Sequence, residues 1–154
     1  MIDAPEVVRT EAQRVAILRL VIPKAEIREH MGRGIEEVLG VVTAQGIGPT
    51  GPLLTRHHRI AADVWDFDIG VPVSAAVTPT GRVVGGELPA ATVVRTTYHG
   101  AYEGLPGGWG ELETWSKANG HQPSGELWER YVVGPESTKD PADWRTELNR
   151  PLLA

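Results

Sequence analysis

The spacing of hydrophobic residues changes along the chain, and the changes predict strands and helices in alternation. Residues 15–22, VAILRLVI, form an apolar run that ends at Pro23 and predicts a strand. Apolar residues then recur at spacings of three and four, which predicts a helix with one buried stripe. This stripe consists of Ile27, Met31, Ile35, Val38, Leu39 and Val42. Two further strands are predicted at 53–60 and 64–73, after a turn-rich stretch at 46–52.

The strand predicted at 64–73 alternates most clearly between apolar and acidic residues. Trp65, Phe67 and Ile69 lie on one side, and Asp66 and Asp68 lie on the other. Because side chains of a strand point alternately to its two faces, we expect one buried face here.

The second half of the chain repeats the order of the first. A strand is predicted at 88–98, followed by a glycine-rich entry into a helix that ends at Asn119-Gly120. Two more strands are predicted at 126–133 and 144–148. Strand, helix, strand, strand therefore occurs twice, which favours an α+β fold with an antiparallel sheet and two helices on one face.

Length and composition agree with one globular domain, for which we predict residues 1–154, with pseudo-repeats at roughly 12–75 and 87–153. The chain has no cysteine, which excludes disulfides, thiolate metal sites, iron–sulfur clusters and cysteine nucleophiles. A net charge of −5 disfavours binding to phosphate backbones, so we expect no direct nucleic-acid partner.

The N-terminal residues lack the apolar core of a signal peptide, and no apolar stretch approaches the length needed to span a bilayer. We therefore expect a cytoplasmic protein without a membrane partner.

The strand at 126–133 carries the most informative chemistry. Alternation places Glu129 and Tyr131 on one face together with Leu127 and Val133. If that face points inward, Glu129 is a carboxylate among apolar groups, and such a group must be paired, protonated or available to a cationic ligand. The alternative is that Glu129 bonds a neighbouring Arg or faces water at a sheet edge.

Aromatic residues accumulate in the second half, where four of the five Trp lie after residue 108. Trp109, with Tyr98, Tyr102 and Tyr131, either lines a concave, mostly apolar ligand site or belongs to the core. For Trp115 we favour the core.

Other site chemistries find little support. His57 and His58 are adjacent in a strand and point to opposite faces, so they cannot jointly chelate one ion. The glycine-rich run at 104–110 lacks the Lys-Ser/Thr pair of a phosphate loop, and no serine lies in a nucleophile elbow. We expect no metal and no cofactor.

Several short motifs, in their order and spacing, together resemble the GyrI-like small-molecule-binding family, over roughly residues 12–153. This family includes effector-binding domains of AraC-type and MerR-type multidrug regulators. The motifs are Tyr98-His99-Gly100-Ala101-Tyr102, the helix with Trp109 and Trp115, Glu129-Arg130-Tyr131, Thr146-Glu147-Leu148, Phe67 to Val73 and Glu87 to Ala90.

The resemblance implies duplicated strand-helix-strand-strand units related by a pseudo-twofold, with a ligand cleft between the halves. It also implies that Glu129 is the cleft carboxylate and that aromatic rings pack around flat, often cationic molecules. The ligand-binding residues that we expect are Glu129, Tyr131, Tyr98, Tyr102, Trp109, His57 and Phe67. The sequence departs from the family at His57, where Tyr is more usual, and at Ala101, where Pro is often found. The first departure leaves the charge preference for ligands open.

Three functions are compatible with this resemblance. The first is a binder or sequestrator of hydrophobic or cationic small molecules. The second is a detoxifying hydrolase that opens cyclopropane-bearing electrophiles, with Glu129 activating water and Tyr131 positioning the electrophile. The third is a protein-interaction role, since the family takes its name from an inhibitor of DNA gyrase.

The likeness begins near residue 12, which leaves no room in this sequence for a helix-turn-helix or another DNA-binding domain. We therefore do not expect this chain alone to control transcription. A partner regulator encoded separately, or gyrase itself, stays open as a partner.

Overall fold

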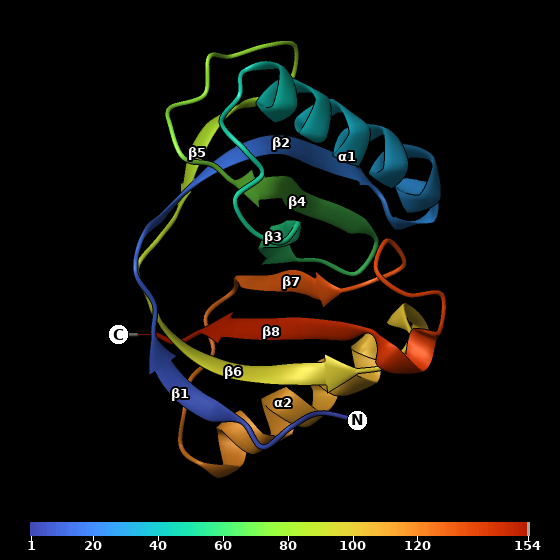
Figure 1. The fold of residues 1–154 in the computed structure, drawn as a ribbon. Coiled ribbons are helices and arrows are strands. Elements are labelled where there is room, and N and C mark those ends of the chain that lie inside the picture. The colour runs from blue at the N-terminus through green and yellow to red at the C-terminus, as the bar shows by residue number, and fades with distance from the viewer. Residues whose placement is uncertain (154) are drawn as a thin grey trace. The chain divides into compact units, whose positions relative to one another are not determined.

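The computed structural model describes residues 1–153, and the chain divides into two compact units. Unit 1 comprises Met1–Thr10 together with the chain from Ala91 onward, and unit 2 is Glu11–Ala90. Each unit contains a set of four antiparallel strands and one α-helix. Figure 1 labels these elements. The predicted α+β class and the predicted duplication are therefore confirmed.

Unit 2 starts with the predicted strand and helix. Its elements are β2 (Gln13–Pro23), α1 (Ile27–Ala44), β3 (Leu54–Ile60), β4 (Val64–Pro72) and β5 (Val84–Leu88). The strand order is β3-β4-β2-β5, and a short 3-10 helix, Lys24–Glu26, leads from β2 into α1. The helix α1 packs against β2 and β4 (Figure 1).

The core of unit 2 forms where the helical stripe meets alternate residues of the two central strands. Leu18 pairs with Ile69 and Leu20 pairs with Phe67, and all four side chains are buried. A Cβ added at Gly34 would overlap the Ile69 side chain, so a glycine in this helix allows α1 to approach the sheet closely.

The predicted buried face of β4 is confirmed, and the opposite face, with its two acids, is buried as well. Asp66 and Asp68 are only 5% and 3% exposed. Asp66 accepts hydrogen bonds from Arg19 and Arg59 at 3.0 Å, and Asp68 lies 2.8 Å from His58 Nε2. Both faces are buried because neighbouring strands supply partners for the acids.

Unit 1 repeats this plan. Its elements are β1 (Glu6–Arg9), β6 (Thr92–His99), α2 (Leu105–Ala118), β7 (Leu127–Val133) and β8 (Arg145–Pro151). The strand order is β1-β6-β8-β7, and the 3-10 helix Tyr102–Gly104 leads into α2. A third short 3-10 helix, Pro141–Asp143, precedes β8.

The edge strands β1 and β5 were not predicted. β1 belongs to unit 1 although unit 2 follows it in the chain, and β5 belongs to unit 2 although the rest of unit 1 follows it. β1 directly precedes β2 but pairs with β6, and β5 directly precedes β6 but pairs with β2. None of the helices in residues 1–153 has the length and apolar character needed to cross a membrane.

Candidate functional site

Glu129 is buried in unit 1, with 8% of its surface exposed. It lies on β7 opposite Leu148 of β8, and Tyr131 lies opposite Thr146. Since Leu148 packs in the same apolar cluster as Leu112 of α2, the face that carries Glu129 is the face that the helix covers. The alternation on this strand placed Glu129 and Tyr131 on one face and left its direction open, and in the structure this face points inward.

Two neutral donors hold the Glu129 carboxylate. Trp109 Nε1 donates to Oε2 at 2.7 Å, and the Tyr131 hydroxyl donates to Oε1 at 2.8 Å. An indole N–H and a phenol fix the orientation of the carboxylate, but neither of them cancels its charge.

Aromatic rings lie beside this carboxylate. The Tyr102 ring centroid is 5.8 Å from that of Tyr131 in an edge-on arrangement, and 4.9 Å from that of Trp144. Burial raises the pKa of Tyr102, and the carboxylates of Glu136 and Glu129 raise it further. The phenol therefore stays protonated at neutral pH and can act as a donor.

Gly134 makes room for this ring. A Cβ at Gly134 would lie 2.8 Å from the Tyr102 hydroxyl oxygen and 3.0 Å from Oε2 of Glu136. The Tyr102 hydroxyl and the Glu136 carboxylate therefore both lie close to Gly134, where a side chain would displace them.

The remaining predicted residues of unit 1 have core positions. Tyr98 is 6% exposed, its hydroxyl donates to the Ala101 carbonyl at 2.8 Å, and its ring lies against Gly108 of α2. Trp115 packs against the same apolar cluster and stacks on His121 with a centroid distance of 5.8 Å. The expected core role of Trp115 agrees with this position.

The two predicted residues of unit 2 lie together. The His57 ring stacks on Phe67 with centroids 5.2 Å apart, and it meets Trp65 edge-on at 5.4 Å. Burial, together with the charges of His58 and Lys24, lowers the pKa of His57 to about 4. His57 is therefore a neutral imidazole at pH 7.

Four residues beside these groups were missed from the sequence: Trp144, Glu136, Trp65 and Lys24. A comparison of the two halves could have found Trp144, because it stands two residues before Thr146 as Trp65 stands two residues before Phe67. Lys24 carries no local signal, since a lysine after a strand is usually a solvated residue.

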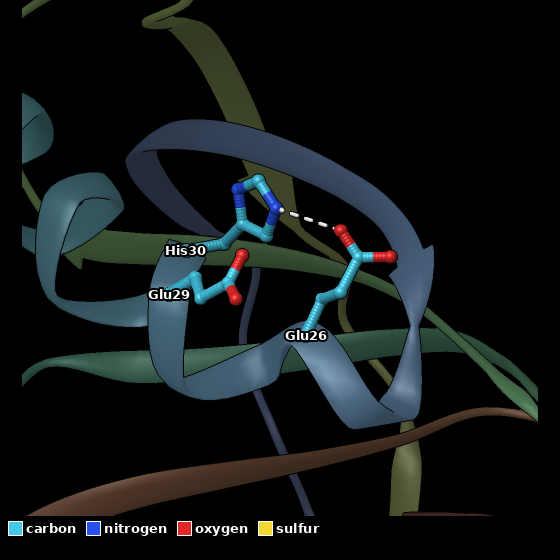
Figure 2. A group of neighbouring side chains, drawn as sticks. All are labelled: Glu26, Glu29 and His30. Atoms are coloured by element: carbon cyan, nitrogen blue, oxygen red, sulfur yellow. Dashed lines mark ion pairs between the residues drawn. The ribbon is translucent and has the colours of Figure 1, made fainter.

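Among the described residues, one group of side chains has ligand atoms close enough to surround a metal ion. Glu26, Glu29 and His30 lie at the start of α1 with these atoms within 4.8 Å of one another (Figure 2). Glu26 and His30 form an ion pair at 3.5 Å across one helical turn, and Glu29 is exposed. Acids are favourable near a helix N-terminus without any ion, so we assign no metal here.

An open groove of about 660 Å³ runs elsewhere in unit 1, beside the N-terminal segment and α2. It is lined by Ile2, Pro5, Gly110, Glu111, Thr114 and Trp115. None of the seven predicted ligand-binding residues lines this groove.

The chain belongs to the GyrI-like family, because the model of the GyrI-like small molecule binding domain matches residues 3–152. No curated protein sequence matches the chain. The C-terminal domain of EcmrR superposes with a TM-score of 0.83 at 22% identity, and the match covers 97% of both chains. EcmrR in a DNA complex gives a TM-score of 0.84 at 21% identity; the match covers 97% of this chain but 57% of EcmrR.

Two further solved structures share the fold. A hydrolase from Listeria innocua gives a TM-score of 0.72 at 12% identity, covering 97% of this chain and 91% of the hydrolase. SAV2435 bound to tetraphenylphosphonium gives 0.65 at 9% identity, covering 99% of this chain and 95% of that protein. At these identities the likenesses establish the fold.

Proposed function

We propose that this GyrI-like domain binds flat organic cations at Glu129. The observation that carries the proposal is the buried carboxylate held by Trp109 and Tyr131 beside further aromatic rings. A cation gains charge pairing from Glu129 and cation–π attraction from Tyr102 and Trp144, and both effects are stronger in a site that excludes water.

Related proteins support an aromatic cation as the ligand. The family is named for small-molecule binding, and SAV2435 was captured with tetraphenylphosphonium, a bulky aromatic cation. The residues of this chain supply the chemistry that such a cation needs, an acid and several rings. The proposal includes a cytoplasmic location, which the absence of cysteine favours.

Calorimetric titration with N-methylquinolinium, a two-ring cation, tests the proposal. We expect Glu129→Gln to weaken binding about tenfold or more, because the variant keeps the shape of the side chain and loses its charge. Glu113→Gln is the matched control, since Glu113 is an exposed acid of α2 in an exposed ion pair with Lys117. Equal affinities of wild type and Glu129→Gln would refute the proposal.

A second candidate is hydrolysis of cyclopropane-bearing electrophiles at the same residues. It is favoured by the phenol of Tyr131 on Glu129 and by the fold shared with a Listeria innocua hydrolase. Glu129 would accept a proton from water as the water oxygen bonds to a ring carbon. The strained C–C bond would break toward a conjugated carbonyl, whose enolate then takes up a proton.

Mass spectrometry of a cyclopropane-bearing alkylator incubated with the protein tests this candidate. Addition of one water to the alkylator by wild type, but not by Glu129→Ala, would support it. Equal rates for both proteins exclude catalysis by Glu129.

A further inference from the structure

Unit 2 contains a counterpart of the Glu129 site, position by position. The register of β3 on β4 shifts between His57 and Arg59, and the register of β7 on β8 shifts between Tyr131 and Val133. His57 and Tyr131 are therefore the last regularly paired residues before the same irregularity in equivalent strands.

The neighbouring side chains correspond in the same way. Trp65 stands two residues before Phe67, the partner of His57, and Trp144 stands two residues before Thr146, the partner of Tyr131. Lys24 and Tyr102 also correspond, because each is the first residue of the 3-10 helix that leads into the long helix of its unit.

The contacts in unit 2 match those in unit 1. Lys24 Nζ lies 4.2 Å from the centroid of the Trp65 ring, where unit 1 has the Tyr102 ring 4.9 Å from Trp144. His57 meets Trp65 edge-on at 5.4 Å, and Phe67 completes the aromatic surface below the imidazole. Each unit therefore presents a tryptophan capped by the first residue of a 3-10 helix.

The charges of the two sites are opposite. Glu129 stands two residues before Tyr131, and the residue two before His57 is Thr55, which is buried. Trp109 follows Tyr102 by seven residues, and the residue seven after Lys24 is Met31. Unit 2 thus has a hydroxyl and a thioether where unit 1 has the carboxylate and its indole donor, and an ammonium where unit 1 has a phenol.

Two polar groups beside Trp65, the Lys24 ammonium and the His57 imidazole, suit an anion. Within residues 1–153 the Lys24 ammonium forms no ion pair with a carboxylate and lies on an aromatic face. A neutral His57 has one N–H to donate, and the pKa of about 4 keeps it neutral at pH 7.

We infer that Lys24, His57 and Trp65 form a second ligand-binding site, which takes aromatic carboxylates or sulfonates. Lys24 Nζ pairs with the anionic group, the His57 N–H donates to it, and the ring of the ligand packs on Trp65. The inference rests on the proposed function, because the Glu129 site is the template for the comparison.

Two ligands of similar size and opposite charge test the inference on the protein of residues 1–154. Calorimetric titrations use 2-naphthoate as the anion and N-methylquinolinium as the cation. We expect Lys24→Gln to weaken 2-naphthoate binding about tenfold and to leave N-methylquinolinium binding unchanged. Lys24→Arg should retain 2-naphthoate binding, and Lys117→Gln is the control for loss of an exposed lysine, 69% exposed on α2.

The outcomes separate this inference from the proposed function. Weakening of 2-naphthoate binding by Lys24→Gln, and not by Glu129→Gln, supports the anion site even if N-methylquinolinium fails to bind. No binding of 2-naphthoate to wild type, or equal affinities for wild type and Lys24→Gln, overturns it. In that case Lys24 only covers the Trp65 ring, and this conclusion holds whether or not N-methylquinolinium binds at Glu129.

Discussion

The Glu129 carboxylate shows how donors from a helix and a strand orient a buried acid. Each of its oxygens receives a hydrogen bond below 2.9 Å, from Trp109 and from Tyr131. A buried carboxylate that loses such a donor keeps the full free-energy cost of leaving water. Removal of either donor should therefore destabilise the fold by more than the net contribution of an average hydrogen bond.

The donor role of Trp109 can be measured by a double-mutant cycle. Trp109→Phe keeps most of the apolar surface and removes the N–H, so we expect it to lower the free energy of unfolding by about 1–3 kcal/mol. In the background of Glu129→Gln the same substitution should cost less, because a neutral amide tolerates the missing donor better. Urea denaturation of the four proteins checks this, and equal costs in both backgrounds would contradict a donor role.

His57 should make stability depend on pH. Its pKa is lowered from 6.5 to about 4 in the folded protein, so the unfolded chain binds more protons between these values. The stabilisation is fully present above pH 6.5 and falls as the pH drops toward 4, by at most about 3 kcal/mol.

The comparison of wild type with His57→Phe isolates this effect. Phe suits the apolar surroundings of Trp65 and Phe67 and does not titrate. Urea denaturation at intervals from pH 7.5 to 4.5 should show wild type losing stability relative to the variant. Parallel stability curves would mean that His57 does not titrate as described.

At the residue scale, a contact could be predicted from the sequence only where its two residues lie close together in the chain. Glu129 and Tyr131 are two residues apart on a strand, so alternation alone placed their side chains on one face. The Trp109 contact joins a helix to a strand 20 residues later, and no periodicity carries that information. The same holds for Tyr102 on Trp144, although the resemblance to the family had singled out Tyr102.

At the scale of elements, β4 is buried on both faces, whereas its alternation predicted one buried face. Its alternation gave the correct two faces, but Asp66 and Asp68 look like solvent-facing residues when the strand is considered alone. Their partners Arg19, Arg59 and His58 come from β2 and β3. The burial of a polar face therefore follows from strand pairing, which single-strand patterns do not contain.

Asp66 should act as a connector of three strands. Burial acts to raise the pKa of Asp66, but hydrogen bonds from Arg59 and Arg19 outweigh it and hold this pKa below its ordinary value of 3.8. We expect Asp66→Asn to reduce the free energy of unfolding at pH 7 by about 1–3 kcal/mol. The difference should shrink as the pH falls below 3.8, because wild type then loses the carboxylate.

Glu37→Gln is a suitable control for this experiment. Glu37 also pairs with an arginine, Arg82, but both side chains are largely exposed. Breaking an exposed pair of this kind costs little stability, because water screens both charges. A loss for Asp66→Asn no larger than that of the control would show that the three-strand connection contributes little.

On the scale of the whole molecule, the exchange of edge strands links the duplicated units through the chain. Only three residues separate β1 from β2, yet β1 pairs with β6 some 80 residues later. The hydrophobic pattern could not show this exchange, because β1 and β5 are short and carry glycines or charges. The repeat limits of 12–75 and 87–153 remain a prediction.

The exchange predicts where the effect of an N-terminal deletion appears. Residues 1–9 cover one edge of β6: Asp3 N–H donates to the Thr97 carbonyl, and His99 N–H donates to the Met1 carbonyl. Without them, alternate amides of residues 92–99, including His99, lose their acceptors, while the amides between them keep their partners on β8. Hydrogen exchange should therefore speed up at alternate positions of β6.

The control lies in the same protein, because β2 follows the deletion directly in the chain but pairs with β4 and β5. If strand pairing determines which amides lose protection from hydrogen exchange, the amides of residues 13–23 stay protected as in wild type and the loss appears in β6. If proximity in the chain decides it, residues 13–23 lose protection first. Residue-resolved exchange by NMR distinguishes the two, and a loss confined to 13–23 would contradict the edge-strand exchange.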